Sequence, residues 1–342
     1  MDALSTIGLS KAYGRRELPI PRRRDHGGGH RSGAAIRALE DLSISVHVGE
    51  IFGFLGPNGA GKSTTIRLLL GFIHPTAGSG SVLGLDIVRD CVAIRSRVGY
   101  LPGGIALYDS LSGEGLLDYL GRLTGRPSTR RAELVDRLEM SARTLRRPVR
   151  DYSRGMRQKM GIIQALQHDP ELAILDEPTE GLDPLMQRAF YGILDDLKAA
   201  GRTIFFSSHI LSEVERVCDR VAIVRRGRLV ALEDITSLLQ HRKRNVELRA
   251  IDGDLPVLDG VAGVSAVART TDGRLTCHLE GDVAPFLAAI GGHRIADLTI
   301  EPAHLEEAFL ELYEGEDVGD DESEEAEEGA EADTPAPEAV AR

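Results

Sequence analysis

The 342-residue sequence contains no tryptophan, and aromatic residues make up only 4% of it. It has no run of about 18 apolar residues, the length that a membrane-spanning helix requires, so we expect no transmembrane segment. Its first residues lack the basic and apolar regions of a signal peptide. Cysteine is also scarce, and Cys91, Cys218 and Cys277 are too far apart to suggest a metal site or a disulfide framework. These absences predict a cytoplasmic protein whose cysteines are reduced thiols.

The sequence also lacks an excess of basic residues. Its net charge is −12, and residues 314–342 account for all of it, with 13 acidic residues and one arginine. The other residues comprise 40 acidic and 40 basic side chains, so the body of the protein is neutral. Broad binding to nucleic acid needs a basic face, and we therefore expect no specific nucleic-acid partner.

The pattern of short apolar runs separated by helical stretches predicts an α/β fold with a mainly parallel sheet. Buried strands are expected at 50–55, 172–175, 203–206 and 221–224. Residues 3–13 and 42–48 are further predicted strands, residues 14–37 a flexible basic insertion that contains Arg22, Arg23 and Arg24, and residues 105–168 a mainly helical region. The length favours two domains with appendages.

The composition changes after residue 232. Between 244 and 313, β-like runs at 246–250 and 275–279 alternate with helical runs at 282–290 and 303–313. This pattern predicts a small α/β accessory domain over residues 233–313. Residues 314–342 are acidic and contain no aromatic residue, so they cannot bury enough apolar surface to offset the entropy of ordering, and we predict a disordered tail.

A glycine-rich segment at 56–64 carries the strongest chemical signal. It fits the phosphate-binding pattern G-x-x-x-x-G-K-[ST] and lies between a predicted strand and a predicted helix at 64–70. The glycines let the backbone N–H groups curl around a phosphate chain, and the helix directs its positive end toward it. Lys62 adds a positive charge and the Ser63 hydroxyl can bind Mg²⁺. The predicted phosphate-binding residues are Gly56, Pro57, Asn58, Gly59, Ala60, Gly61, Lys62, Ser63 and Thr64.

Four more polar groups follow in order along the chain: 152–158, Asp176 with Glu177, 181–183, and His209. Asp176 ends a predicted buried strand, and the carboxyl ends of parallel strands form the ligand-binding edge of such a sheet. Asp176 can hold a metal there, while Glu177 can polarise a water molecule against the γ-phosphate. His209 can contact the same phosphate. Phosphoryl transfer needs mainly such positioning and charge stabilisation.

At these residues the chain resembles the nucleotide-binding subunits of ATP-binding cassette (ABC) transporters. Residues 56–64 look like the Walker A motif, 172–177 like Walker B with its catalytic glutamate, and 152–156 like the family signature in the Tyr-Ser-x-Gly-Met form. The resemblance covers residues 1–232, and the C-terminal extension is similar to that of the daunorubicin-resistance, ABC-2 type export branch. It implies a P-loop NTPase fold with a parallel core, an antiparallel β subdomain and a helical subdomain.

The resemblance also implies roles and partners. ATP and Mg²⁺ would be the ligands, with Ser63 and Asp176 holding the metal, Glu177 and His209 acting in catalysis, and Tyr13 stacking on adenine. Two copies would dimerise head to tail, so that the signature of one chain contacts the ATP of the other, and the dimer would drive a separate membrane permease from the cytoplasmic face. The residues implied at the dimer interface are Ser153, Arg154, Gly155 and Met156 of the signature and Asp183 of the D-loop.

One position departs from the family pattern. The family usually has glutamine, or sometimes glutamate, just after a Gly-Tyr-Leu-Pro-like run, and here that position is Gly103. Such a side chain normally touches Mg²⁺ or the attacking water and senses the membrane partner. Its absence predicts weaker coupling to Mg²⁺ or a substitute ligand, and not a loss of activity.

Two other functions stay open at this point. The chain could be a soluble cassette ATPase that acts on nucleic acid or ribosomes, although such proteins commonly carry two cassettes or long insertions, which are absent here. It could also be a regulatory module that uses ATP only to dimerise, although Glu177 and His209 argue for hydrolysis. The transported substrate is not indicated by the sequence.

Overall fold

The computed structural model describes residues 2–14, 36–240, 244–251, 255–270 and 273–301. The chain divides into two compact units, Met1–Ile235 and Thr236–Arg342. The division lies shortly after residue 232, where the composition changes. Each unit is described by itself below.

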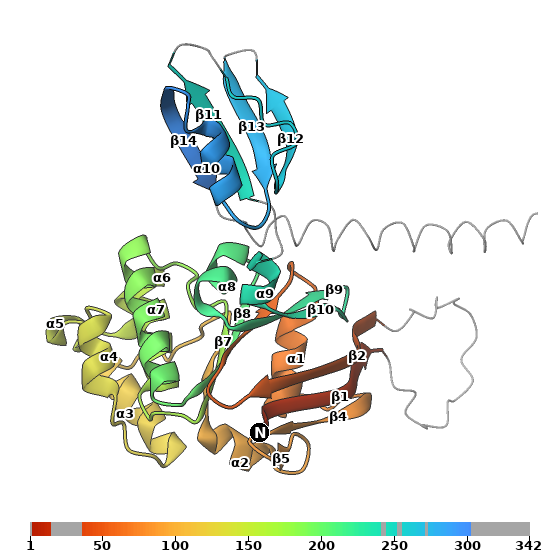
Figure 1. The fold of residues 1–342 in the computed structure, drawn as a ribbon. Coiled ribbons are helices and arrows are strands. Elements are labelled where there is room, and N and C mark those ends of the chain that lie inside the picture. The colour runs from red at the N-terminus through yellow and green to blue at the C-terminus, as the bar shows by residue number, and fades with distance from the viewer. Residues whose placement is uncertain (1, 15–35, 241–243, 252–254, 271–272, 302–342) are drawn as a thin grey trace, which may run out of the picture. The chain divides into compact units, whose positions relative to one another are not determined.

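An antiparallel sheet with the strand order β2-β1-β4-β5 forms one side of the first unit (Figure 1). Its strands are β1 (Asp2–Tyr13), β2 (Ile36–His47), β4 (Ala77–Val82) and β5 (Leu85–Asp86). β2 begins six residues before the predicted strand because Ile36 pairs with Tyr13 across the sheet, so residues 36 and 37 belong to a strand and not to the predicted insertion. Residues 15–35, with Arg22, Arg23 and Arg24, lie outside the described residues.

A mainly parallel sheet forms the centre of the same unit, in the order β10-β9-β3-β8-β7-β6. Its strands are β3 (Ile51–Leu55), β6 (Val98–Leu101), β7 (Leu172–Asp176), β8 (Thr203–Ser208), β9 (Arg220–Arg225) and β10 (Arg228–Asp234). Every residue of β3, β7 and β8 is buried, as expected for a parallel sheet covered on both faces. In this register Leu55 pairs with Ser208 and Asp176 with Ser207, so the carboxyl ends of the three strands meet at one edge.

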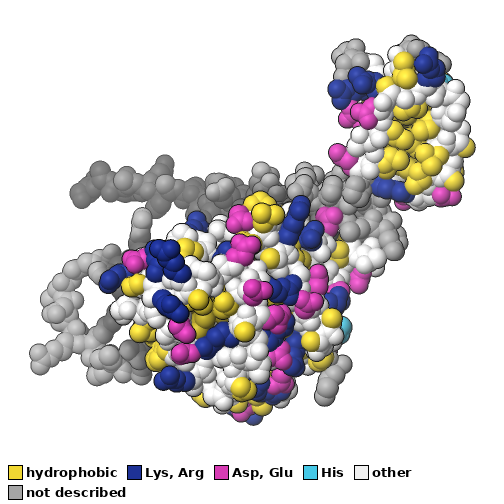
Figure 2. All heavy atoms as spheres, turned by 90° about the vertical axis from the view of Figure 1, so that its left-hand side faces the viewer, with side chains coloured by type: hydrophobic (Ala, Val, Ile, Leu, Met, Phe, Trp, Pro, Cys, Tyr) yellow, Lys and Arg dark blue, Asp and Glu magenta, His cyan; other side chains and the backbone are white. Residues whose placement is uncertain are grey.

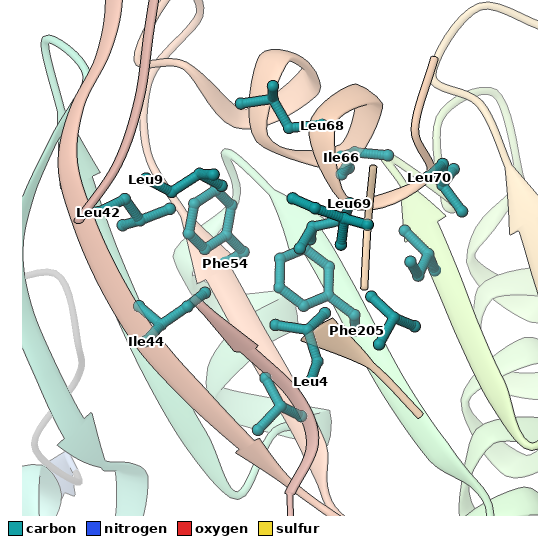
Figure 3. Packing of buried hydrophobic residues seen from close by; sticks show 14 of the residues in the cluster. Leu4, Leu9, Leu42, Ile44, Phe54, Ile66, Leu68, Leu69, Leu70 and Phe205 are labelled. Carbon is teal, nitrogen blue, oxygen red and sulfur yellow. The ribbon is translucent and has the colours of Figure 1, made fainter. Parts of the chain in front are cut away.

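Helix α1 (Lys62–Leu69) joins the two sheets into one core. Its residues Ile66, Leu68 and Leu69 pack with Phe54 of β3 and with leucines of β1 and β2 (Figure 3). All of these side chains are fully buried, and each contributes about 1.5–3 kcal/mol of hydrophobic stabilisation. Because the helix is held on both sides, its N-terminal end has a defined position at the edge of the parallel sheet.

Most of the remaining helices of this unit lie on the side away from the antiparallel sheet, but the first of them lies beside β5 of that sheet (Figure 1). The remaining helices are α2 (Cys91–Arg97), α3 (Gly113–Thr124), α4 (Arg131–Arg137), α5 (Ala142–Leu145), the 3₁₀ turn η1 (Val149–Asp151), α6 (Arg154–Leu166), α7 (Pro184–Ala199) and α8 (Leu211–Val217). Helix α9 (Ile235–Gln240) begins at the last residue of this unit, and its other residues belong to the second unit. Acidic and basic side chains are interspersed on the face shown in Figure 2. Within the described residues, no helix is both long enough and apolar enough to cross a membrane.

The second unit contains an antiparallel sheet with the order β12-β13-β11-β14. Its elements are β11 (Arg244–Ala250), β12 (Val264–Arg269), β13 (Arg274–Leu279), α10 (Ala284–Ile290) and β14 (Ile295–Glu301). Phe286 and Ile290 of α10 pack on the inner face of the sheet, beside Leu248 and Leu275, to form a separate core. The predicted helix at 303–313 and the acidic tail at 314–342 lie outside the described residues.

Candidate functional site

The glycine-rich loop runs from the end of β3 to the start of α1. Its backbone passes so close to other segments that a side chain would not fit at two positions. A Cβ atom at Gly56 would lie 2.3 Å from the carbonyl oxygen of Val224, and one at Gly61 would lie 2.7 Å from that of Ala38. Gly61 also has a φ of 104°, a backbone conformation that favours glycine. The glycines of the motif are therefore required by packing as well as by any bound phosphate.

Lys62 lies inside this loop, and its side chain is only 6% exposed. Its ammonium group donates to the carbonyl oxygens of Gly56 at 2.6 Å and of Pro57 at 3.2 Å. It also lies 3.4 Å from Oε1 of Glu177. The positive charge is thus held at the loop and beside the carboxylate that follows β7.

The Asp176 carboxylate joins the first turn of α1 to the ends of β7 and β8. Its Oδ2 accepts a hydrogen bond from the Ser63 hydroxyl at 2.9 Å, and its Oδ1 accepts one from Ser207 at 2.9 Å. The carboxylate and the hydroxyl are hard oxygen donors of the kind that Mg²⁺ prefers. Among the described residues there is no group of three or more His, Cys, Asp or Glu able to hold a metal alone. This donor set fits Mg²⁺, which commonly takes one or two protein oxygens together with waters and substrate phosphates.

Glu177 and His209 contact each other directly. Nδ1 of His209 lies 2.7 Å from Oε2 of Glu177, while the other carboxylate oxygen faces Lys62. Glu177 has a φ of 50°, a left-handed conformation that costs a non-glycine residue about 1 kcal/mol. Its N–H donates to the Ser207 carbonyl oxygen at 3.0 Å. The backbone therefore turns sharply after Asp176 and directs two successive carboxylates to different partners.

A pocket of about 460 Å³ collects most of the predicted phosphate-site residues. Those that line it are Pro57, Asn58, Gly59, Gly61, Lys62, Ser63, Thr64, Asp176 and Glu177; among the predicted site residues that do not line it are Tyr13, Gly56, Ala60 and His209. The structure adds lining residues that the sequence reasoning did not single out for the site: Ala38, Arg67, Tyr100, Pro102 and Gly104. Of these, Arg67 lies one helical turn after Ser63, so the helical period could have identified it.

Tyr100 comes from β6, the edge strand of the parallel sheet. Burial raises its pKa, and the negative charge of Asp176 raises it further, while Arg67 acts in the opposite direction. The phenol is therefore kept neutral beside the carboxylate. Tyr100 belongs to the Gly-Tyr-Leu-Pro-like run before Gly103, but the sequence reasoning gave it no role, because it reaches the pocket through the strand order of the sheet.

Gly103 lines the same pocket. A Cβ atom at this position would lie 3.2 Å from Oδ2 of Asp176. A longer side chain at residue 103 would therefore begin directly beside the carboxylate that bonds Ser63. The short distance agrees with the expectation from the sequence that Gly103 lacks a side chain that would otherwise contact the metal.

Tyr13 ends β1 and does not line the pocket. Its side chain is 40% exposed, and the Lys11 ammonium lies 5.3 Å from the centre of its ring. The ring is accessible to a stacking partner, and its contact with adenine stays a prediction.

The signature residues lie beside the D-loop segment and do not line the pocket of their own chain. The Ser153 hydroxyl caps α6 by accepting from the Met156 N–H at 3.2 Å, and Arg154 forms an ion pair with Glu180. A Cβ atom at Gly155 would lie 2.9 Å from the carbonyl oxygen of Gly181. Asp183 caps α7 by accepting from the N–H groups of Leu185 and Met186, each at 3.0 Å.

Comparison with known proteins identifies the class. The family description "ABC transporter" matches residues 39–180. An ABC transporter ATP-binding protein of Nostoc sp. (strain PCC 7120) is 40% identical over 82% of this chain and 84% of its own length. A Nod factor export ATP-binding protein I of Cupriavidus pinatubonensis is 36% identical over 80% and 85%. The daunorubicin resistance ATP-binding protein DrrA3 of Streptomyces coeruleorubidus is 33% identical over 83% and 92%.

Solved structures agree with this result. The ATP-binding subunit of an ABC transporter superposes with a TM-score of 0.59 at 30% identity, covering 69% of this chain and 91% of that one. The dimeric bacterial ABC transporter cassette MJ0796 gives the same TM-score at 20% identity, covering 68% and 98%, which shows a common fold. The chain belongs to the ATP-binding proteins of ABC transporters, and its enzyme class is that of the ABC ATPases.

Proposed function

We propose that this protein is the ATP-hydrolysing subunit of an export system, bound to a separate membrane permease at the cytoplasmic face of the membrane. The observation that carries the proposal is the convergence of Lys62, Ser63, Asp176 and Glu177 at one pocket. Lys62 and Ser63 are the first two residues of α1, Asp176 ends β7 and Glu177 follows it. This arrangement supports phosphoryl transfer to water.

Each group has a distinct role in the proposal. The loop N–H groups and Lys62 bind the phosphate chain of ATP. Ser63 and Asp176 would hold Mg²⁺, which would neutralise the charge on the phosphates when bound. Glu177 accepts a proton from the attacking water, and His209 contacts the γ-phosphate and holds the Glu177 carboxylate in place at 2.7 Å.

A head-to-tail dimer completes the site in this proposal. The residues Ser153, Arg154, Gly155 and Met156 do not line the pocket of their own chain, so they are available to contact the nucleotide of a second copy. Asp183 and the neighbouring Gly181 loop lie beside the signature and belong to the same surface. Two identical chains arranged in this way have two equivalent sites, and ATP binding and hydrolysis close and reopen the dimer.

The export direction is supported by the relatives whose names describe Nod factor export and daunorubicin resistance. The permease is proposed as a second chain that docks on the helical region at 105–150 and the nearby Gly103 loop. The neutral charge of the chain outside 314–342 favours this reading over a nucleic-acid-dependent ATPase.

Glu177→Gln tests the proposed catalytic base. The variant should bind ATP and lose hydrolysis about 100-fold or more, because a general base contributes about that much, and it should accumulate as an ATP-bound dimer. Phosphate release and size-exclusion chromatography with ATP measure the two effects.

Glu233→Gln, an exposed change in β10, serves as the control for the loss of one negative charge. Normal turnover by the Glu177 variant would contradict the role of this carboxylate. An ATPase activity stimulated by nucleic acid, and not by the permease, would contradict the transport function.

A further inference from the structure

A second carboxylate lies just behind the Glu177–His209 pair. Glu213 is on α8, four residues after His209, and only 5% of it is exposed. Its Oε2 accepts a hydrogen bond from the Ser208 hydroxyl at 2.8 Å, and its Oε1 accepts one from the Thr179 hydroxyl. Both donors are buried as well, Ser208 completely and Thr179 at 4% exposed.

The two donors come from the two segments that carry the proposed catalytic groups. Thr179 lies two residues after Glu177, and Ser208 directly precedes His209. One carboxylate therefore joins the loop after β7 to the end of β8. Ser208 is also bonded to the phosphate-binding loop, because its carbonyl oxygen accepts from the Gly56 N–H at 3.3 Å.

The pair in front of Glu213 is also held by the pairing of β7 with β8, by the hydrogen bond from the Glu177 N–H to the Ser207 carbonyl oxygen and by Lys62. The His209 side chain is 45% exposed, so packing alone does not hold its ring, and Glu177 has a left-handed backbone that must be stabilised by its surroundings. The distance of 2.7 Å between Nδ1 and Oε2 thus depends on the separation of the two backbone segments. The β7–β8 ladder ends at Asp176–Ser207, and the tie between Thr179 and Ser208 through Glu213 fixes the two segments beyond that last pair.

Glu213 has a third contact, with α7. The pKa of Tyr191 is raised to about 12, first by burial and then by the negative charge of Glu213. Arg216 lies over the Tyr191 ring at 5.2 Å. Helix α7 begins at the D-loop cap Asp183, so Glu213 connects the D-loop helix as well as the two segments.

We propose that Glu213 is a positioning residue for ATP hydrolysis: its carboxylate ties Thr179 to Ser208 and so holds His209 against Glu177. It does not line the pocket and touches no reacting atom. The inference rests on the roles proposed above for Glu177 and His209, and it adds a residue whose loss impairs the chemical step without impairing ATP binding.

The variant Glu213→Gln tests the inference in the full-length protein. Glutamine keeps the shape but replaces one acceptor oxygen by an NH₂ group, so one of the two hydroxyl donors loses its acceptor. We expect kcat to fall about 10- to 100-fold, as for other small misplacements of catalytic groups, with an unchanged KM for ATP. Thr179→Val should lower kcat in the same way.

Thr203→Val is the matched control. Thr203 is also a buried threonine with a hydrogen bond, to the Gly49 N–H at 3.0 Å, but it lies at the opposite end of β8. This variant should keep kcat even if it unfolds more easily. A loss of kcat in Thr203→Val equal to that in Thr179→Val would show a general effect of destabilisation and would overturn the inference.

A double-mutant comparison separates positioning from stability. In a His209→Ala background, Glu213→Gln should cause almost no further loss of kcat, because residues that act as a unit are not additive. An undiminished loss in that background would overturn the inference, and so would a normal kcat of Glu213→Gln alone. If Glu177→Gln is inactive while Glu213→Gln is normal, this inference fails and the proposed function stands; if Glu177→Gln is active, both fail.

Discussion

At the scale of single residues, Lys62 is held between two loop carbonyl oxygens and Glu177. Its ammonium group has three donors and no acceptor, and these three oxygens occupy them, so a bound phosphate would replace one of the three. Lys62→Ala should weaken ATP binding about 10- to 100-fold, the loss expected for a hydrogen bond to a charged group. Titration with a fluorescent ATP analogue measures the affinity.

Lys159→Ala, a change on α6 outside the pocket, is the control for the removal of one positive charge. An unchanged affinity of the Lys62 variant would contradict its role at the phosphates.

Gly103 is the residue at which the chain departs from its family. Because a Cβ atom there would lie 3.2 Å from Asp176, Gly103→Gln places an amide oxygen beside the proposed metal-binding oxygens after a small local shift. We expect the Mg²⁺ concentration for half-maximal ATPase activity to fall. A titration of activity with Mg²⁺ measures it.

Gly104→Gln is the matched control for this prediction. Gly104 also lines the pocket, but a Cβ atom there meets nothing within 4 Å. The same Mg²⁺ dependence in wild type and Gly103→Gln would show that position 103 does not affect the metal.

At the scale of elements, one ion pair joins the end of α2 to the start of β7. Arg97 donates to Glu171 from Nε at 3.0 Å and from a terminal nitrogen at 2.6 Å. Hydrogen bonding to Arg97 lowers the pKa of Glu171 below its usual value. A carboxylate with a lowered pKa stabilises the fold above its unfolded pKa, and this contribution is lost as the pH falls through the folded pKa.

Glu171→Gln should therefore destabilise the protein most near pH 7, and the difference from wild type should shrink as the solution is acidified. Urea unfolding curves from pH 7 down to about pH 3, below the unfolded pKa of the carboxyl group, measure this difference. A difference in unfolding free energy between wild type and Glu171→Gln that stays constant over this range would contradict the stabilising role of the Glu171 carboxylate. Glu233→Gln again provides the control.

The elements also differ in how well the sequence predicts them. β3, β7 and β8 are continuous apolar runs and were predicted to within a few residues. β4 was missed because Ala77–Val82 is rich in glycine and serine and has no apolar alternation; it is a strand because it pairs with β1, for example Val82 with Leu4. A strand of this kind depends on its partner, since its own residues have little preference for the extended state.

At the scale of the whole molecule, each unit has its own hydrophobic core. The core of the first unit includes Phe54, Phe205 and Leu69, and that of the second unit includes Phe286 and Leu248. A fragment of residues 1–235 should therefore fold and bind ATP with unchanged affinity, because every lining residue of the pocket lies within it. Cooperative unfolding and nucleotide titration check this expectation.

Lys62→Ala within the fragment is the control for specific binding. A fragment that aggregates or fails to bind ATP would show that the first unit needs the second one.

Local sequence patterns are sufficient to predict the central residues of the proposed phosphate site. The segment 56–64 and the pair Asp176–Glu177 are local patterns, because a phosphate loop and two adjacent carboxylates need only neighbouring residues to be recognisable. Only the tertiary structure brought Ala38, Tyr100 and Ser207 to the same place. The sequence patterns give these residues no role at the site, and their position follows from strand order and register, which are set by packing between segments far apart in the chain.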